Sequence, residues 1–106
     1  MRAPTPIEKL PVLFLGFNRP DLTRRTLEHL VSLGVENIYA VVDGPRSAVP
    51  GEEERVSRVR EQVRTVAGRR LKGERFQEHN LGCRRGERAG IDWFFSKVES
   101  GDMVED

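Results

Sequence analysis

The sequence contains only one cysteine and two histidines. The single Cys83 excludes an internal disulfide framework, so a reducing cytoplasm is the expected compartment. His29 and His79 are far apart in the chain and have no metal-ligand spacing. Disulfide scaffolds and histidine-based metal sites are therefore disfavoured.

Long apolar runs and a strong net charge are also missing. The longest apolar runs, such as residues 11–17, stop far short of the ~20 residues that span a bilayer, and the proline-bearing N-terminus is unlike a secretory signal. We therefore expect no membrane span. Eighteen basic and seventeen acidic residues leave a formal charge of +1, which disfavours global binding of nucleic acid. A chain of 106 residues with 37% hydrophobic content predicts one small globular domain.

Apolar β-rich segments alternate with segments of helical periodicity. We expect a flexible N-terminal arm over residues 1–10 and one domain over residues 11–106. Strands are expected at 11–17, 37–42, 70–78 and from 103, and helices at 20–34, 52–68 and from Gly86 to Gly101. This alternation predicts an α/β fold with a doubly wound parallel sheet in the order 3-2-1-4 and helices on both faces. Because no turn signal follows the last segment, we expect that strand to be truncated and the domain to be incomplete at its C-terminus.

Polar residues follow each expected strand. They are Asn18 and Arg19, then Asp43 and Gly44, then Asn80, Gly82 and Cys83, and finally Glu105 and Asp106. Because parallel strands end at the same edge of a sheet, these residues should converge on one rim, where α/β proteins bind ligands. Polar loops also end strands in α/β domains without a ligand there. The sequence has neither a GxxxxGK[ST] motif nor a GxGxxG motif after the first strand, which disfavours a P-loop or a dinucleotide-binding unit.

Four ordered motifs carry a resemblance to a known group. VLFLGFNRPDLTRRTLEHL, VVDGPR, NLGCRRGERAGIDWFF and a final VED resemble the nucleotide-sugar-binding half of GT-A fold glycosyltransferases, in particular family 2-like and N-acetylglucosaminyltransferase I-like enzymes. The resemblance covers residues 11–106 in order. It implies a Rossmann-like half-domain that binds the nucleoside diphosphate sugar, with UDP-sugar as the expected donor and an unknown acceptor.

The resemblance also implies roles for particular residues. Asn18 and Arg19 would lie along the nucleotide, and Asp43 would contact the base or ribose of uridine. The loop residues that would form the wall of the donor site are Asn80, Gly82 and Gly86. From its rim position we expect Asp43→Ala to weaken UDP binding with little effect on stability.

Glu105 and Asp106 match the opening of the family's acidic metal motif. The implied cofactor is a divalent metal, Mn²⁺ or Mg²⁺, because a departing diphosphate gathers negative charge that such a cation neutralises. The next position of the motif, which carries the direct metal ligand in E-D-D members, is absent from this sequence. The catalytic base also lies outside the matched half, so the catalytic residues are unknown and the chain alone is expected to be inactive.

Two other functions remain open. One is a non-catalytic nucleotide-binding or scaffold domain of the same fold, which an Asp following Asp106 in the parent gene would argue against. The other is nucleic-acid binding through clustered arginines, namely Arg69, Arg70, Arg84, Arg85 and Arg88. Because no aromatic residues are interleaved with these arginines and no binding motif is recognised, nucleic-acid binding is disfavoured.

Overall fold

The computed structural model describes residues 6–98 and 102–105, and it is an α/β domain with a parallel sheet. Its main elements are β1 (Pro11–Gly16), α1 (Pro20–Ser32), β2 (Asn37–Val42), α2 (Glu52–Ala67), β3 (Leu71–Phe76), α3 (Cys83–Lys97) and β4 (Asp102–Glu105). Short 3₁₀ turns precede β1 and β3, at Ile7–Lys9 and Gly68–Arg70. The predicted α/β class is confirmed, and the alternating elements lie close to the predicted ranges.

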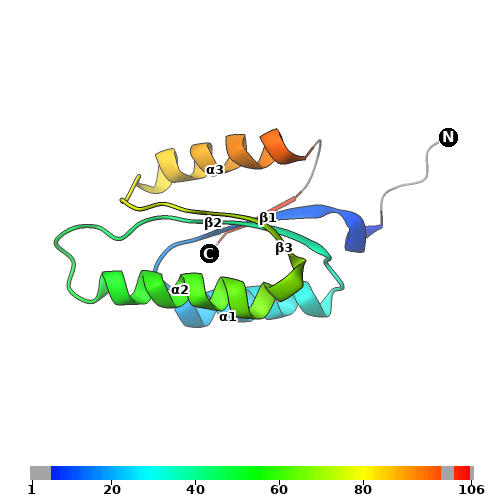
Figure 1. The fold of residues 1–106 in the computed structure, drawn as a ribbon, viewed down its shortest axis with the longest axis horizontal. Coiled ribbons are helices and arrows are strands. Elements are labelled where there is room, and N and C mark those ends of the chain that lie inside the picture. The colour runs from blue at the N-terminus through cyan, green and yellow to red at the C-terminus, as the bar shows by residue number, and fades with distance from the viewer. Residues whose placement is uncertain (1–5, 99–101, 106) are drawn as a thin grey trace.

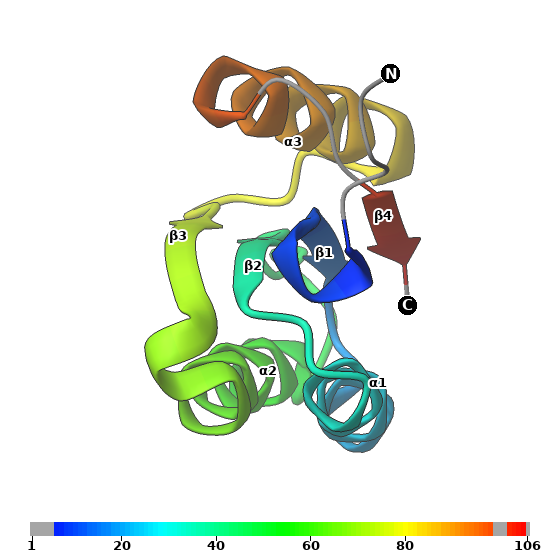
Figure 2. The same ribbon diagram turned by 90° about the vertical axis from the view of Figure 1, so that its right-hand side faces the viewer.

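The sheet has the order β3-β2-β1-β4, and every neighbouring pair of strands is parallel. The central pair is in register from Pro11 beside Asn37 to Gly16 beside Val42, and Glu105 of β4 lies beside Leu15. Helices α1 and α2 lie together along one face of the sheet, whereas α3 lies along the other face (Figures 1 and 2). The carboxyl ends of β1, β2 and β3 therefore open at the same edge, where α3 begins.

Alternation along the two central strands produces two hydrophobic cores of unequal size. Successive side chains of a strand point to opposite faces, so Val12 and Phe14 face α1 and α2 while Leu13 and Leu15 face α3. The larger core also contains Leu27, Leu30, Val35, Ile38, Ala40, Val42, Val56, Val59, Val63 and Ala67. Among the described residues, the smaller core has four buried members, Leu13, Leu15, Val41 and Phe94, with half-buried Tyr39, Ile91, Trp93 and Val98 around them. Within this part of the chain, α3 therefore packs on fewer buried apolar side chains than α1 and α2 do.

Helix α3 begins at Cys83, before the start that the sequence indicated at Gly86. Its N-cap is Gly82, whose φ of 85° lies in the left-handed region that glycine adopts at low cost. Gly86 lies inside the first turns of the helix instead of preceding it. The glycine that marks the boundary is thus Gly82, and the predicted start was wrong by one helical turn.

The described part of the N-terminal segment lies against the start of β2. The Lys9 ammonium is 2.6 Å from a carboxylate oxygen of Glu36, and the Glu36 backbone N–H donates to the carbonyl of Glu8. The Asn37 side-chain amide donates to the carbonyl of Lys9. Residues 6–10 of the expected arm are therefore attached to the sheet, and residues 1–5 lie outside the described residues. Within the described ranges, no helix is long and apolar enough to cross a membrane.

Candidate functional site

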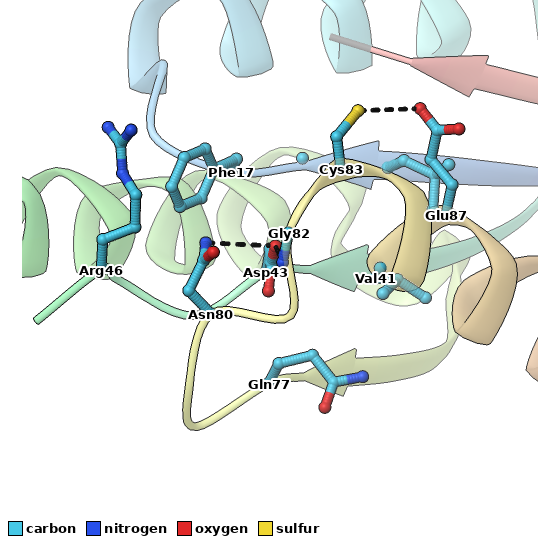
Figure 3. Close-up of a pocket in the computed structure, with 12 residues that line it drawn as sticks. Phe17, Val41, Asp43, Arg46, Gln77, Asn80, Gly82, Cys83 and Glu87 are labelled. Atoms are coloured by element: carbon cyan, nitrogen blue, oxygen red, sulfur yellow. Dashed lines mark hydrogen bonds between the residues drawn. The ribbon is translucent and has the colours of Figure 1, made fainter.

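A cavity of about 350 Å³ lies at the carboxyl ends of β1, β2 and β3 and extends under the start of α3 (Figure 3). Its lining residues are Leu15, Gly16, Phe17, Val41, Asp43, Arg46, Gln77, Asn80, Gly82, Cys83, Gly86 and Glu87. Leucine, valine and phenylalanine side chains supply apolar walls, and charged or amide side chains stand around them. An apolar cavity with a few placed polar groups is the usual form of a small-molecule site.

The Asp43 carboxylate joins the end of β2 to the loop that opens α3. One oxygen accepts hydrogen bonds from the backbone N–H groups of Gly44 and Leu81, both at 2.8 Å. The other accepts from the Gly82 N–H and the Asn80 amide, both at 3.2 Å. The negative charge thus lies at the N-terminus of α3, where the helix dipole favours an anion, and serves in place of a local side-chain cap. Asp43 therefore lines the cavity and also holds the loop of residues 80–82 in place beside it.

Gly44 allows the β3–α3 loop to approach β2 closely. A Cβ atom on Gly44 would lie 2.5 Å from the carbonyl carbon of His79 and 2.8 Å from the carbonyl oxygen of Gln77. Because both are backbone atoms, neither could move aside cheaply. The Asn80 amide donates to the Gly44 carbonyl at 2.9 Å, which closes the contact. The loop and the Asp-Gly turn therefore fit together only with glycine at this position.

Glu52 is the buried carboxylate of the region. It lies in the first turn of α2 and is fully buried. One of its oxygens accepts hydrogen bonds from the Arg46 backbone N–H at 2.8 Å and the Arg46 Nε at 2.9 Å. The other accepts from Arg46 Nη2 at 2.5 Å and from the Asn18 amide at 3.2 Å. These hydrogen bonds, chiefly those of the Arg46 side chain, lower the pKa of Glu52 from 4.5 to about 2 against the opposing effect of burial.

Phe17 and Arg46 stand together at one end of the cavity. The Arg46 guanidinium carbon lies 5.6 Å from the centre of the Phe17 ring, within the range of a cation–π contact. At the other end the Cys83 thiol donates to a Glu87 carboxylate oxygen at 3.3 Å. In Figure 3, Asp43, Asn80 and Gly82 lie between Arg46 and Glu87. The cavity thus has a cationic end and an acidic end.

Gln77 supplies a further polar group to the cavity. Its backbone N–H continues the ladder by donating to Val42 at 2.9 Å, and its carbonyl accepts from Arg60 at 2.6 Å. Its side-chain nitrogen is buried and has no hydrogen-bond partner among the described residues. A buried amide in a cavity wall can donate to a carbonyl or phosphoryl oxygen of a ligand.

The structure brings together some of the predicted site residues and separates others. Asp43, Asn80, Gly82 and Gly86 all line the cavity. Asn18 does not line the cavity, and its side-chain amide donates to Glu52. Arg19 is exposed at the start of α1 and is not one of the residues that line this cavity. The cavity therefore gathers predicted residues from the end of β2, the β3–α3 loop and the start of α3, and neither of the two that follow β1.

The predicted metal residues lie at the edge of what the structure describes. Glu105 ends β4 beside Leu15, a cavity residue, so its backbone lies at the same rim. Asp106 lies outside the described residues. Among the side chains that are described, no three His, Cys, Asp or Glu residues group closely enough to hold a metal ion.

The arginines considered for nucleic-acid binding do not share one surface. Arg69 and Arg70 precede β3, whereas Arg84, Arg85 and Arg88 follow it on α3. The two groups are thus at opposite ends of β3, and α3 covers the opposite face of the sheet from α2 (Figure 2). This separation gives no continuous basic stripe for a polyanion.

Among the aromatic and polar side chains that line the cavity, four were not singled out from the sequence: Phe17, Arg46, Gln77 and Glu87. Two of them had a local signal, since Phe17 ends the first apolar run and Arg46 closes the VVDGPR motif. Glu87 follows Cys83 by one helical turn, which becomes visible only once the start of α3 is known. Gln77 had no signal of its own.

Comparison with known proteins identifies no relative. No protein-family model, no curated protein and no solved structure matches the chain.

Proposed function

We propose that the cavity binds a nucleoside diphosphate sugar, with UDP-sugar as the expected donor, and that the chain is the donor-binding part of a GT-A type glycosyltransferase. The observation that carries the proposal is the set of hydrogen bonds that the Asp43 carboxylate accepts from Asn80, Leu81 and Gly82. These bonds join the ends of β2 and β3 to the start of α3 around one cavity. Ligands of parallel α/β sheets bind at such carboxyl ends. The VVDGPR and NLGC motifs that carry the resemblance supply these same residues.

The cavity also suits the size and chemistry of a nucleotide. A volume of about 350 Å³ lies in the range of small-molecule sites. Leu15, Val41 and Phe17 offer apolar surface for a flat base, and the Gln77 side-chain nitrogen, which has no partner among the described residues, can donate to a polar edge of the base or ribose.

In the proposed reaction the bond between the anomeric carbon and the diphosphate oxygen breaks, and a bond from the acceptor oxygen to that carbon forms. UDP leaves with the bonding electron pair, and the acceptor hydroxyl loses its proton to a base. None of the cavity residues is assigned as that base. Their proposed work is to bind and orient the donor and to exclude water from one side of it.

A divalent metal is part of the proposal, at Glu105 and Asp106. Carboxylate oxygens are the ligands that Mg²⁺ and Mn²⁺ prefer, and the end of β4 lies at the cavity rim. When bound, the metal would neutralise charge on the diphosphate. We also keep the cytoplasm as the proposed compartment, because the one cysteine has no partner cysteine with which to form an internal disulfide.

Calorimetric titration with UDP and UDP-glucose, with ADP as a comparison ligand, tests the proposal. Cys83→Trp places a large side chain at the cavity wall, whereas Arg84→Trp places it on the neighbouring residue, which does not line the cavity. We expect UDP affinity to fall by about tenfold or more in Cys83→Trp and to be nearly unchanged in Arg84→Trp. Absence of UDP binding by the wild-type chain, or an equal loss in both variants, would contradict the proposed site.

Transfer to an acceptor is tested separately. Sugar transfer from UDP-sugar by the full-length protein favours the enzyme, whereas UDP binding without transfer or donor hydrolysis favours the non-catalytic nucleotide-binding domain.

A further inference from the structure

Arg46 has a position in the cavity that the proposed function does not yet explain. Among the described residues that line the cavity it is the one cation, and the two carboxylates that accompany it are Asp43 and Glu87. Asp43 already accepts four hydrogen bonds. Glu87 accepts from Cys83 at the far end of the cavity (Figure 3). An anionic part of a ligand is therefore favoured at the Arg46 end.

One edge of the Arg46 guanidinium is occupied and the other is available. Nε and Nη2 both donate to Glu52, as does the Arg46 backbone N–H. Nη1 makes no hydrogen bond to the described residues, and the side chain remains 54% exposed. A guanidinium held in this way presents its free donors in a fixed plane, which is the arrangement that phosphoryl oxygens bind well.

The local charge remains positive although Glu52 is ionised. Nη2 of Arg55 lies 3.8 Å from the same Glu52 oxygen that Arg46 contacts, so two arginines share one carboxylate. Arg55 does not line the cavity, and only Arg46 can present this excess charge to a ligand there. The neighbouring Phe17 ring, against which Arg46 packs, lies beside apolar wall that suits a base instead of a phosphate.

We infer that Arg46 is a specificity-determining residue that contacts the phosphoryl groups of the ligand and makes the cavity prefer nucleoside diphosphates over nucleosides. Glu52 and Asn18 are positioning residues, because they fix the guanidinium without reaching the ligand. This inference rests on the proposed function and adds a residue to it. It also shifts the phosphate contact from Arg19, which the resemblance implied, to Arg46.

The test is a series of calorimetric titrations of the whole chain with uridine, UMP, UDP and inorganic pyrophosphate. In the wild-type chain, affinity should rise from uridine to UDP. Arg46→Ala should lower UDP affinity by about tenfold or more and leave uridine affinity within about twofold, since a charge-assisted hydrogen bond to a phosphate is lost and base contacts remain. Arg46→Lys, which keeps the charge without the fork, should give an intermediate loss.

Two controls keep the result interpretable. Arg55→Ala removes the other arginine on Glu52 and, because Arg55 does not line the cavity, should reduce the preference for UDP over uridine less than Arg46→Ala does. Arg19→Ala should leave that preference unchanged. If Arg46→Ala does not fold, since Glu52 would be buried without its partner, the double variant Arg46→Ala/Glu52→Gln removes that charge and should show the same loss of preference. Glu52→Gln alone should reduce the preference for UDP over uridine less than Arg46→Ala does. If Arg46 had only a structural role, neither variant would change the affinity for UDP relative to that for uridine.

The outcomes separate the two proposals. Equal losses for uridine and UDP in Arg46→Ala, or an effect of Arg55→Ala or Arg19→Ala as large as that of Arg46→Ala, overturn the role of Arg46 while UDP binding stands. Binding of pyrophosphate or ADP that depends on Arg46, without binding of uridine, supports the role of Arg46 and overturns the uridine assignment. No binding of any phosphorylated ligand by the wild-type chain overturns both.

Discussion

Single side chains carry more of this rim's structure than their positions in the sequence suggest. Asp43 ends a strand and precedes a glycine, a setting in which an aspartate usually forms a turn. It does bond to the Gly44 N–H, but it also accepts three hydrogen bonds from residues 80–82. The sequence-based expectation that Asp43→Ala would leave stability almost unchanged is therefore replaced by a different one.

We expect Asp43→Ala to lower the free energy of unfolding by about 2 to 3 kcal/mol, because three backbone N–H groups and one side-chain amide lose a charged partner. Urea denaturation followed by circular dichroism measures this, and Asp92→Ala on the exposed side of α3 is the matched control. A loss no larger than that of the control would mean that the loop holds its shape without the carboxylate.

Glu52 should make the fold sensitive to acid. Its pKa is about 2 in the folded chain and 4.5 without its partners, so the folded state favours the ionised form. This stabilisation is complete above the unfolded pKa and is lost as the pH falls from about 4.5 toward 2. The melting temperature of the wild type should drop as the pH falls through that range. The difference in melting temperature between the wild type and Glu52→Gln should become smaller over the same range, because the variant has no carboxylate to protonate at this position. Glu53→Gln, in the same helical turn but exposed, should follow the wild type.

At the scale of elements, α3 is the helix whose placement decides the cavity. It contributes Cys83, Gly86 and Glu87 to the lining, and its N-cap Gly82 contributes a fourth residue. Gly90 brings the helix onto the sheet: a Cβ there would lie 2.9 Å from Cδ2 of Leu15 and 3.4 Å from Cγ2 of Val41. The distance between α3 and β1 is therefore set by the absence of a side chain.

Gly90→Val should lift α3 and cost about 1 to 3 kcal/mol of stability, as overpacked cores do. Ser96→Val, exposed near the end of the same helix, is the control for the lower helix propensity of valine. UDP affinity, if the proposed function holds, should fall with Gly90→Val as well. An unchanged melting temperature in Gly90→Val would show that Leu15 can move aside.

The elements themselves were largely predictable and the path of the loops was not. The strand at 37–42 and the helix at 52–67 can be predicted from the local spacing of apolar residues. The prediction works because the apolar side of each element packs against a hydrophobic core. The start of α3 was misplaced because either Gly82 or Gly86 could mark the beginning of the helix in the sequence. Only the backbone conformation distinguishes them, since Gly82 has a positive φ and Gly86 does not. The Arg46 side chain is held beside the cavity by its hydrogen bonds to Glu52. No spacing in the sequence specifies this contact between Arg46 and Glu52.

At the scale of the whole molecule, the metal proposal concerns the edge strand β4. Because two carboxylates supply few of the oxygens that a divalent ion needs, we expect Mn²⁺ to strengthen UDP binding by this chain only slightly. Titration of UDP with Mn²⁺ and with EDTA measures this effect, with Glu105→Gln as the variant. Equal UDP affinity with Mn²⁺ and with EDTA would point to a metal-independent mechanism.

The unequal cores have a consequence for the order in which the molecule opens. Among the described residues, the core between α3 and the sheet has four buried side chains, and the core on the other face has twelve. Backbone amides of α3 should therefore exchange their hydrogens with solvent sooner than those of α1 and α2, through partial openings that leave the rest of the fold intact. The cavity lies between α3 and the strand ends, so a bound ligand can be held only while α3 is docked. Saturating UDP should slow exchange in α3 selectively, by roughly the ratio of ligand concentration to its dissociation constant.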